Sequence, residues 1–220
     1  MISPLLEKLI ASLRCLPGVG TKTAQRMAFH LLQSKQRTHA QLLAETLQQA
    51  ITEIDYCDQC RIYCEQPLCE ICANPQRILS ICCIVESPAD VLAIEQSGSY
   101  RGRYFVLHGH LSPIDSVGPE QLAIPQLIQQ VQQQQIKELI FATNPTAEGE
   151  ATAYYIQRLL SPSVDCSRIA HGVPIGGELE YLDHHTLQHA MTQRQRILPQ
   201  ITPGGELKRP NQLATAIHET

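Results

Sequence analysis

The sequence lacks several features that would place it in a common class of proteins. No apolar run approaches the roughly 18–20 residues that a membrane-spanning helix needs. The amino-terminal stretch has neither the basic start nor the long apolar core of a secretory signal peptide, so we expect a cytoplasmic protein. There is no Walker A motif, so ATP hydrolysis is not implied, and no G-x-S-x-G motif that would support a hydrolase triad.

The composition, with 43% hydrophobic and 17% charged residues, fits a soluble globular chain. A length of 220 residues gives room for one large domain or two to three small ones. The formal net charge of −4, averaged over the chain, argues against a nucleic-acid partner. Nine cysteines do not imply a disulfide framework here, because thiols stay reduced in the cytosol. The positions of the charges and cysteines are therefore more informative than their totals.

The charges are unevenly distributed along the chain. Residues 1–37 hold six basic residues against Glu7, a net charge of +5, which leaves −9 for the rest. The six basic residues are Lys8, Arg14, Lys22, Arg26, Lys35 and Arg37. A basic head on an acidic body suggests an anionic partner for the head. The alternative is a solvated helix face that is basic by composition.

The head has the sequence pattern of two short helices joined by a tight turn. Ser3 and Pro4 suit the N-cap and the first position of one helix, and Thr21 suits the cap of the next. Between them, residues 16–20 read Leu-Pro-Gly-Val-Gly. Apolar residues at helical spacing predict a third helix near residues 38–54.

The turn has the residues expected of a phosphate-binding loop. Gly18 and Gly20 allow positive φ angles and a close approach of a ligand to the backbone. Amides at a helix N-terminus attract phosphate, and Lys22 and Arg26 lie on one side of the second helix. This element resembles a helix-hairpin-helix, a sequence-independent binder of the DNA backbone. An ordinary helical hairpin with a glycine turn is the alternative.

Four of the nine cysteines have the spacing of metal ligands. Cys57 with Cys60, and Cys69 with Cys72, form two C-x-x-C pairs separated by eight residues. Two such pairs supply the four thiolates of a tetrahedral, structural Zn²⁺ site, one ion per chain. A redox role is the alternative for a single pair. Cys64 lies between the pairs and is interpreted as a free thiol, although the spacing leaves a ligand exchange open.

From about residue 79 the pattern is that of an α/β domain. Short apolar runs predict strands at 81–85, 104–107 and 139–142, with a further short strand near 168–171. Helical stretches are predicted at about 88–96, 121–135 and 149–160. This alternation predicts a parallel sheet with helices on both faces.

Polar residues follow two of these strands, where parallel sheets bind their ligands. Glu86 follows the first strand, and Asn144, Thr146, Glu148 and Glu150 follow the third. The segment 79–175 resembles a Toprim domain, whose family holds Mg²⁺ with a glutamate and an Asp-x-Asp pair. Asn144 and Thr146 occupy the two aspartate positions, and Mg²⁺ is held poorly by the remaining carboxylates. We therefore predict no enzymatic activity but a remnant site that could contact DNA or a partner; a Mg²⁺-dependent nuclease or topoisomerase is the alternative.

The order of hairpin head, four-cysteine element and degenerate Toprim resembles the RecR family of bacterial recombination mediators. The closest strings are residues 13–20, 142–146 with 148–151, and 169–181, and the resemblance runs from about residue 2 to 198. It implies a DNA-repair protein that acts at the nucleoid. It also implies a non-catalytic homo-oligomeric ring, expected to be a tetramer, that clamps single- and double-stranded DNA and works with RecO and RecF to load RecA at gaps. A zinc-stabilised adaptor that binds only proteins is a further alternative.

These observations predict a fold and its divisions. The fold class is α/β, a Toprim-like parallel sheet flanked by helices, with an N-terminal all-α helix-hairpin-helix domain and a small four-cysteine zinc finger. The expected boundaries are 1–54 for the hairpin domain, 55–77 for the finger, 79–175 for the Toprim-like domain, 176–198 for a C-terminal family segment and 199–220 for a flexible tail.

Overall fold

The computed structural model describes residues 3–170, 172–174, 176–192 and 194. The chain divides into two units after Ser167. The expected tail over 199–220 lies outside the described residues. In the described part of the chain, no helix is both long and apolar enough to cross a membrane.

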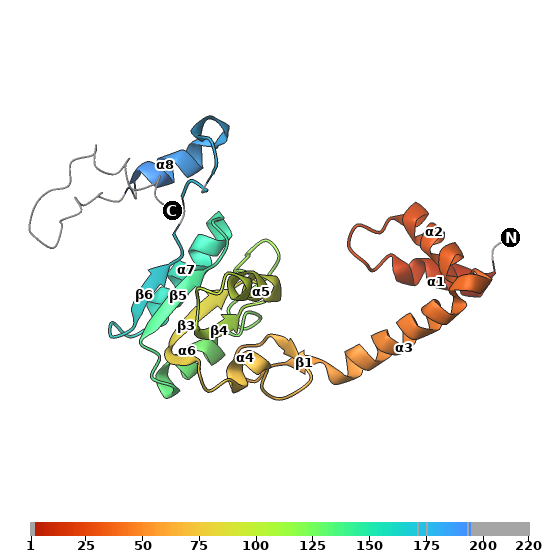
Figure 1. Cartoon of the computed structure of the whole chain (residues 1–220), viewed down its shortest axis with the longest axis horizontal. Helices are drawn as coiled ribbons and strands as arrows, with labels where there is room; N and C mark the ends of the chain where they lie inside the picture. Colours follow the sequence, from red (N-terminus) through yellow and green to blue (C-terminus); the bar gives the residue numbers. More distant parts are fainter. Residues whose placement is uncertain (1–2, 171, 175, 193, 195–220) are drawn as a thin grey trace, which may run out of the picture. The chain divides into compact units, whose positions relative to one another are not determined.

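The first helices form as predicted, with one correction. They are α1 (Pro4–Leu13), α2 (Thr21–Leu31), a 3₁₀ turn (Ser34–Gln36) and α3 (Arg37–Glu53), coloured red to orange in Figure 1. The Ser3 side chain accepts a hydrogen bond from the Leu6 amide and caps α1, as predicted. The predicted cap Thr21 is wrong: Gly20 has the extended backbone of the N-cap, and Thr21 is already helical.

The helical head has almost no core of its own. Ala24 and Ala28 of α2 are buried, whereas α1 and α3 contain no buried residue. The apolar side chains of α3 that the sequence pattern assigns to one face are largely exposed. The head therefore presents a wide apolar surface.

The remainder of the first unit is built on a four-stranded sheet. Its elements are β3 (Ile78–Val85), α5 (Pro88–Gln96), β4 (Gly102–Val106), α6 (Ile124–Gln133), β5 (Glu138–Ala142), α7 (Ala147–Leu159) and β6 (Asp165–Arg168). The strand order is β4-β3-β5-β6, and β3 is parallel to both neighbours, with Val85 opposite Val106 and Ala142. The predicted α/β architecture is confirmed.

Most element boundaries differ from the sequence prediction by one to three residues, and two of these differences have a clear local cause. The last strand lies at Asp165–Arg168 rather than 168–171, because its ladder begins where the Asp165 amide donates to the Lys137 carbonyl. Helix α6 begins at Ile124 rather than near 121, because Ala123 takes a left-handed conformation (φ 51°) that starts the helix there.

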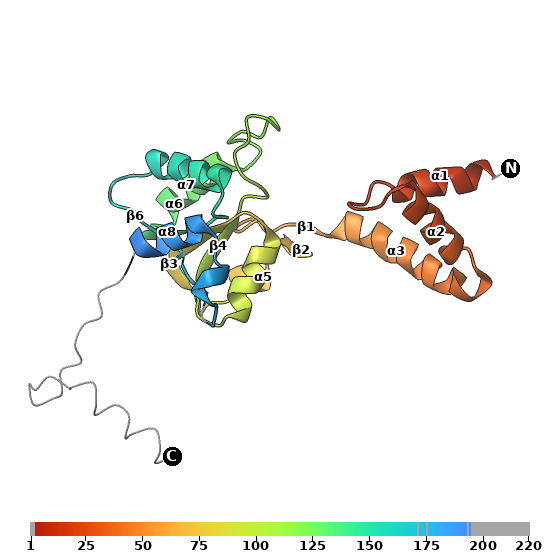
Figure 2. The same ribbon diagram turned by 90° about the horizontal axis from the view of Figure 1, so that it is seen from above.

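The two faces of the sheet have different covers. One face packs against α6 and α7 through a cluster that includes Phe105, Leu127 and Ile156. The other face packs against α5 and the four-cysteine element, in a cluster that joins Cys57 and Cys60 to Val85, Val91 and Val106. Figure 2 shows α6 and α7 on one side of the strands and α5 on the other.

The four-cysteine element, called the finger from here on, has three short pieces. They are β1 (Asp55–Tyr56), β2 (Tyr63–Cys64) and α4 (Glu70–Ala73), with β1 and β2 antiparallel. The second unit, described by itself, contains a 3₁₀ turn (Leu179–Tyr181) and α8 (His184–Thr192).

Candidate metal centre and nucleic-acid interface

The four cysteines that the spacing selected come together in the finger. The Sγ atoms of Cys57, Cys60, Cys69 and Cys72 lie within 4.8 Å of one another. Cys57, Cys60 and Cys69 are buried and Cys72 is half-buried. Among the residues that the structure describes, this is the single group of three or more side chains placed to hold a metal ion.

The geometry and the electrostatics of this group fit a soft divalent cation. A Zn²⁺ ion with four Zn–S bonds of about 2.3 Å has S–S separations of about 3.8 Å, and the Sγ atoms of Cys60 and Cys69 are 3.5 Å apart. Hydrogen bonds from Cys60 and Cys72 hold the pKa of Cys69 far below its ordinary value. The same hydrogen bonding raises the pKa of Cys60 and Cys72. A metal ion stabilises a crowded group of this kind, because the cation takes the place of the protons on the sulfur atoms.

Cys64 is not part of the group. Its thiol donates to the Gln66 carbonyl at 2.8 Å, which directs the sulfur to the backbone of its own loop. Burial raises its pKa, so the neutral thiol is the stable form. This geometry agrees with its interpretation as a free thiol.

Arg61, which the sequence analysis missed, attaches the finger to the sheet. Its guanidinium donates to the carbonyls of Val106 at 3.1 Å and Leu122 at 3.0 Å. The neighbouring Cys60 carbonyl accepts from the Val106 amide at 2.9 Å. These partners are 45 or more residues away in the chain, so no local pattern could have indicated them. Burial lowers the pKa of Arg61. The ordinary pKa of arginine is so high that the side chain stays charged.

At the carboxyl ends of β3 and β5, Glu86 and Asn144 form a closed pair. Glu86 is 6% exposed, and its Oε1 accepts from the Asn144 amide at 2.8 Å. Its Oε2 accepts from the Asn144 side-chain Nδ2 at 2.7 Å. A Cβ on Gly149 would lie 2.1 Å from the Asn144 carbonyl oxygen, so only glycine leaves room for this arrangement. Both Glu86 oxygens therefore accept hydrogen bonds from Asn144, at the edge of the sheet where parallel sheets bind their ligands.

The other residues predicted for this edge serve the start of α7. The Thr146 hydroxyl accepts from the Gly149 amide at 3.1 Å and caps the helix. Glu148 and Glu150 lie in its first turn and are exposed. His110, in the loop after β4, places its Nδ1 at 3.4 Å from Glu86 Oε2.

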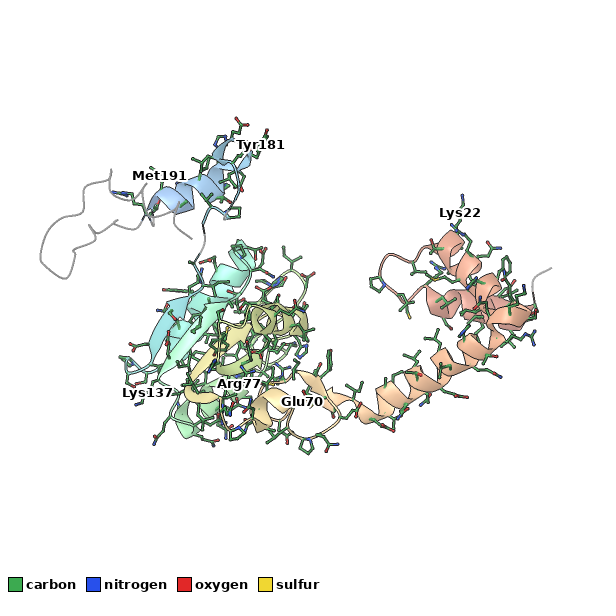
Figure 3. All side chains as sticks on the ribbon, in the orientation of Figure 1. Lys22, Glu70, Arg77, Lys137, Tyr181 and Met191 are labelled. Atoms are coloured by element: carbon green, nitrogen blue, oxygen red, sulfur yellow. The ribbon has the colours of Figure 1, made fainter. Side chains whose placement is uncertain are left out.

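The residues predicted to bind DNA surround the start of α2. Gly18 has φ +76°, which favours glycine, whereas Gly20 has an ordinary φ of −80°. Gly20 is the N-cap of α2 and offers no side-chain cap, so the first amides of the helix face outward. Lys22 and Arg26 are exposed, and Figure 3 shows the Lys22 side chain extending away from the start of α2.

Comparisons with known proteins identify the family. A model of the RecR helix-hairpin-helix matches residues 6–51, a Toprim model matches 80–170, and a model of the RecR C-terminal region matches 172–195. The chain is 56% identical over 195 residues to the recombination protein RecR of Coxiella burnetii (strain RSA 493 / Nine Mile phase I), covering 88% of this chain and 97% of that protein. The chain belongs to the RecR family.

RecR-family membership confirms the resemblance drawn from residues 13–20, 142–151 and 169–181. The family models fall in the same order along the chain as the basic head and the Toprim-like segment of the sequence analysis. The finger lies in the interval between the first two models, where the four cysteines form their metal-binding group.

Proposed function

We propose that this chain is a non-catalytic recombination mediator that clamps DNA through its hairpin heads. The observation that carries the proposal is the open N-terminus of α2, with Gly20 as N-cap and Lys22 and Arg26 exposed beside it. Unpaired amides, the helix dipole and two cations favour a phosphate at this point. Such contacts hold the DNA backbone of single and double strands without reading bases.

Gly20 supports a ligand-binding role for the turn. Its φ is one that any residue adopts, and an added Cβ would meet no atom within 4 Å. Folding therefore does not require glycine at this position. Glycine at the N-cap instead leaves room for a phosphate to approach the backbone amides closely.

The small core of the head supports self-association of the chain. A helical segment of about fifty residues whose buried side chains are Ala24 and Ala28 gains too little from burial to stay folded alone. The exposed apolar side chains of α3 are the surface that a second copy would cover: Leu42, Leu43, Leu47 and Ile51. We assign the assembly as a tetrameric ring, in which several weak hairpins act together on one DNA.

The finger and the remnant Toprim edge have supporting roles in this proposal. Cys57, Cys60, Cys69 and Cys72 would hold one structural Zn²⁺ ion, since four thiolates leave no position for a reactive water. The Glu86–Asn144 pair leaves the Toprim edge without the carboxylate pair that Mg²⁺ chemistry needs. As in the family at large, the partners would be RecO and RecF, and the outcome would be loading of RecA at single-stranded gaps in the bacterial nucleoid, within the cytoplasm.

The test is the double variant Lys22→Ala with Arg26→Ala. We expect its affinity for single- and double-stranded DNA to fall at least tenfold at low salt. The slope of log K against log salt should decrease by about 0.9 for each duplex phosphate contact that is lost. Electrophoretic mobility shift and fluorescence anisotropy measure both quantities.

The matched control is Lys35→Ala with Arg37→Ala, which removes the same charge from exposed positions away from the turn. Equal losses in the two double variants would show a general charge effect and contradict the hairpin assignment. The enzymatic alternative has its own test: nicking or relaxation of supercoiled DNA with Mg²⁺ that disappears in Glu86→Ala would overturn the non-catalytic assignment.

A further inference from the structure

Three rings form an exposed cluster where the finger meets the sheet. Tyr56 and Tyr63 are cross-strand partners in the β1–β2 ribbon, and their rings stack with centroids 5.3 Å apart at an interplanar angle of 26°. The His108 ring lies 4.6 Å from Tyr56 and 5.3 Å from Tyr63. The tyrosines are 43% and 55% exposed and His108 is half-buried, so this aromatic platform (Tyr56, Tyr63 and His108) reaches solvent through its two tyrosine rings.

The platform is held rigidly from below. The guanidinium carbon of Arg61 lies 5.4 Å from the centre of the Tyr56 ring, and its Nη1 donates to the backbone carbonyls of Val106 and Leu122. The Nε2 of His108 donates to the Arg61 carbonyl at 2.7 Å, which fixes the third ring. Burial lowers the pKa of His108, so its ring is neutral at neutral pH. Rings that are already ordered lose little conformational entropy when a ligand binds.

The chemistry of the platform favours an uncharged, flat ligand. The Arg61 guanidinium is buried and its Nη1 donates to backbone carbonyls. The exposed side chain beside Tyr56 is the carboxylate of Asp55, which accepts from the Tyr56 amide. A phosphate would be repelled by this carboxylate, whereas the face of a nucleobase would not. Aromatic side chains stack with every base, because each base has a π-face.

We propose that the Tyr56–Tyr63–His108 platform stacks an unpaired nucleobase of single-stranded DNA. This inference rests on the proposed DNA clamp and adds to it: the hairpins hold phosphates of either form of DNA, and the platform selects single strands. Bases in a duplex are stacked on their neighbours and are not available to a protein ring without unstacking. The platform therefore gives a RecR-family clamp a means to recognise the gap.

The test uses the full chain with two substitutions at the more exposed tyrosine. Tyr63→Leu removes the ring and keeps an apolar side chain, and Tyr63→Trp keeps a ring and introduces a tryptophan into a chain that has none. The probes are an oligothymidine, an abasic oligonucleotide of the same length and a duplex. The abasic strand keeps the phosphates and lacks the bases, so it isolates stacking.

We expect Tyr63→Leu to bind oligothymidine about five- to a hundredfold more weakly than the parent, with its affinity for the abasic strand and the duplex unchanged. In Tyr63→Trp, oligothymidine should quench the tryptophan fluorescence and the abasic strand should not. Tyr63→Phe, which keeps the ring, should bind as the parent does. The matched control is Tyr154→Leu, because Tyr154 is a 62% exposed tyrosine on α7, outside the platform.

Each other outcome overturns the platform in an identifiable way. An unchanged affinity of Tyr63→Leu for oligothymidine would contradict the platform proposal and leave the proposed clamp unaffected. An equal loss on all three probes assigns Tyr63 to folding or to phosphate contact, and the thermal midpoint and metal content of the variant separate these two. If the parent binds none of the probes, the clamp and the platform both fail.

Discussion

At the scale of single residues, Asn144 differs from an aspartate by an NH2 group in place of one oxygen. That group donates to Glu86 Oε2 at 2.7 Å, where an aspartate would place a second negative charge. In a Toprim site of the usual kind, Mg²⁺ relieves the repulsion between two such carboxylates. Here a hydrogen bond does so without a metal, and the buried glutamate is satisfied by the protein alone.

The variant Asn144→Asp should make this edge of the sheet dependent on a cation. Without divalent ions we expect a loss of about 1–3 kcal/mol in the free energy of unfolding, because Glu86 loses a donor and gains a like charge. Millimolar Mg²⁺ should restore about 1 kcal/mol of this loss by binding the two carboxylates. Urea unfolding with Mg²⁺ or with EDTA measures the difference.

The neutral variant Asn144→Ala serves as the control for this comparison. It removes the same hydrogen bond without adding charge, so Mg²⁺ should leave its stability unchanged. The free energy of unfolding of the parent should likewise not change with Mg²⁺. Stabilisation of the parent by Mg²⁺ to the same extent as Asn144→Asp would mean that the native edge already binds the cation, contrary to the geometry of the pair.

At the scale of elements, the finger is part of the core of the sheet domain. Cys57, Cys60 and Cys69 belong to the same buried cluster as Val85 and Val106 of the strands. Arg61 adds hydrogen bonds to the carbonyl of the last residue of β4, Val106, and to two carbonyls after the strand. Loss of the finger therefore exposes one face of the sheet, and the two elements should unfold in one transition.

Removal of the metal should destabilise the sheet together with the finger. For Cys57→Ser we expect the loss of about one zinc ion per chain. The midpoint of thermal unfolding should fall by about 6–12 °C, which corresponds to a loss of about 3 kcal/mol for a unit of this size. Metal analysis and circular dichroism measure the two effects. Cys64→Ser is the matched control and should keep both the ion and the midpoint; a lost ion in this variant would make Cys64 a ligand.

The elements that could be predicted from the sequence are those whose signals are local. The strand 81–85 follows from an apolar run and the helix 88–96 from a helical stretch of sequence, and the C-x-x-C spacing selects the four grouped cysteines. The contacts of Arg61 could not be predicted, because its partners are fixed only when the finger packs on the sheet. The same holds for His108, whose sequence neighbours gave no sign of the two tyrosine rings that it meets.

At the scale of the whole molecule, a basic head with exposed α3 side chains requires a partner surface. Leu47 and Ile51 are 57% and 71% exposed, on a helix with no buried residue. A contiguous apolar surface of this kind typically marks a site of contact with another molecule. In the proposed ring, a second copy of the same head would cover this surface and would place further hairpins on the same DNA.

The variant Leu47→Glu with Ile51→Glu should separate assembly from phosphate contact. Charges on this face should reduce the solution mass measured by sedimentation equilibrium. DNA affinity should fall on the order of a hundredfold, although Lys22 and Arg26 are intact, because single hairpins lose the gain in effective concentration.

The control Gln41→Glu with Gln48→Glu adds the same charge to α3 at exposed polar positions and should keep the mass and most of the affinity. A full-sized assembly of the Leu47–Ile51 variant would show that the ring closes through other surfaces, and an equal loss of affinity in the control would assign the effect to charge repulsion from DNA.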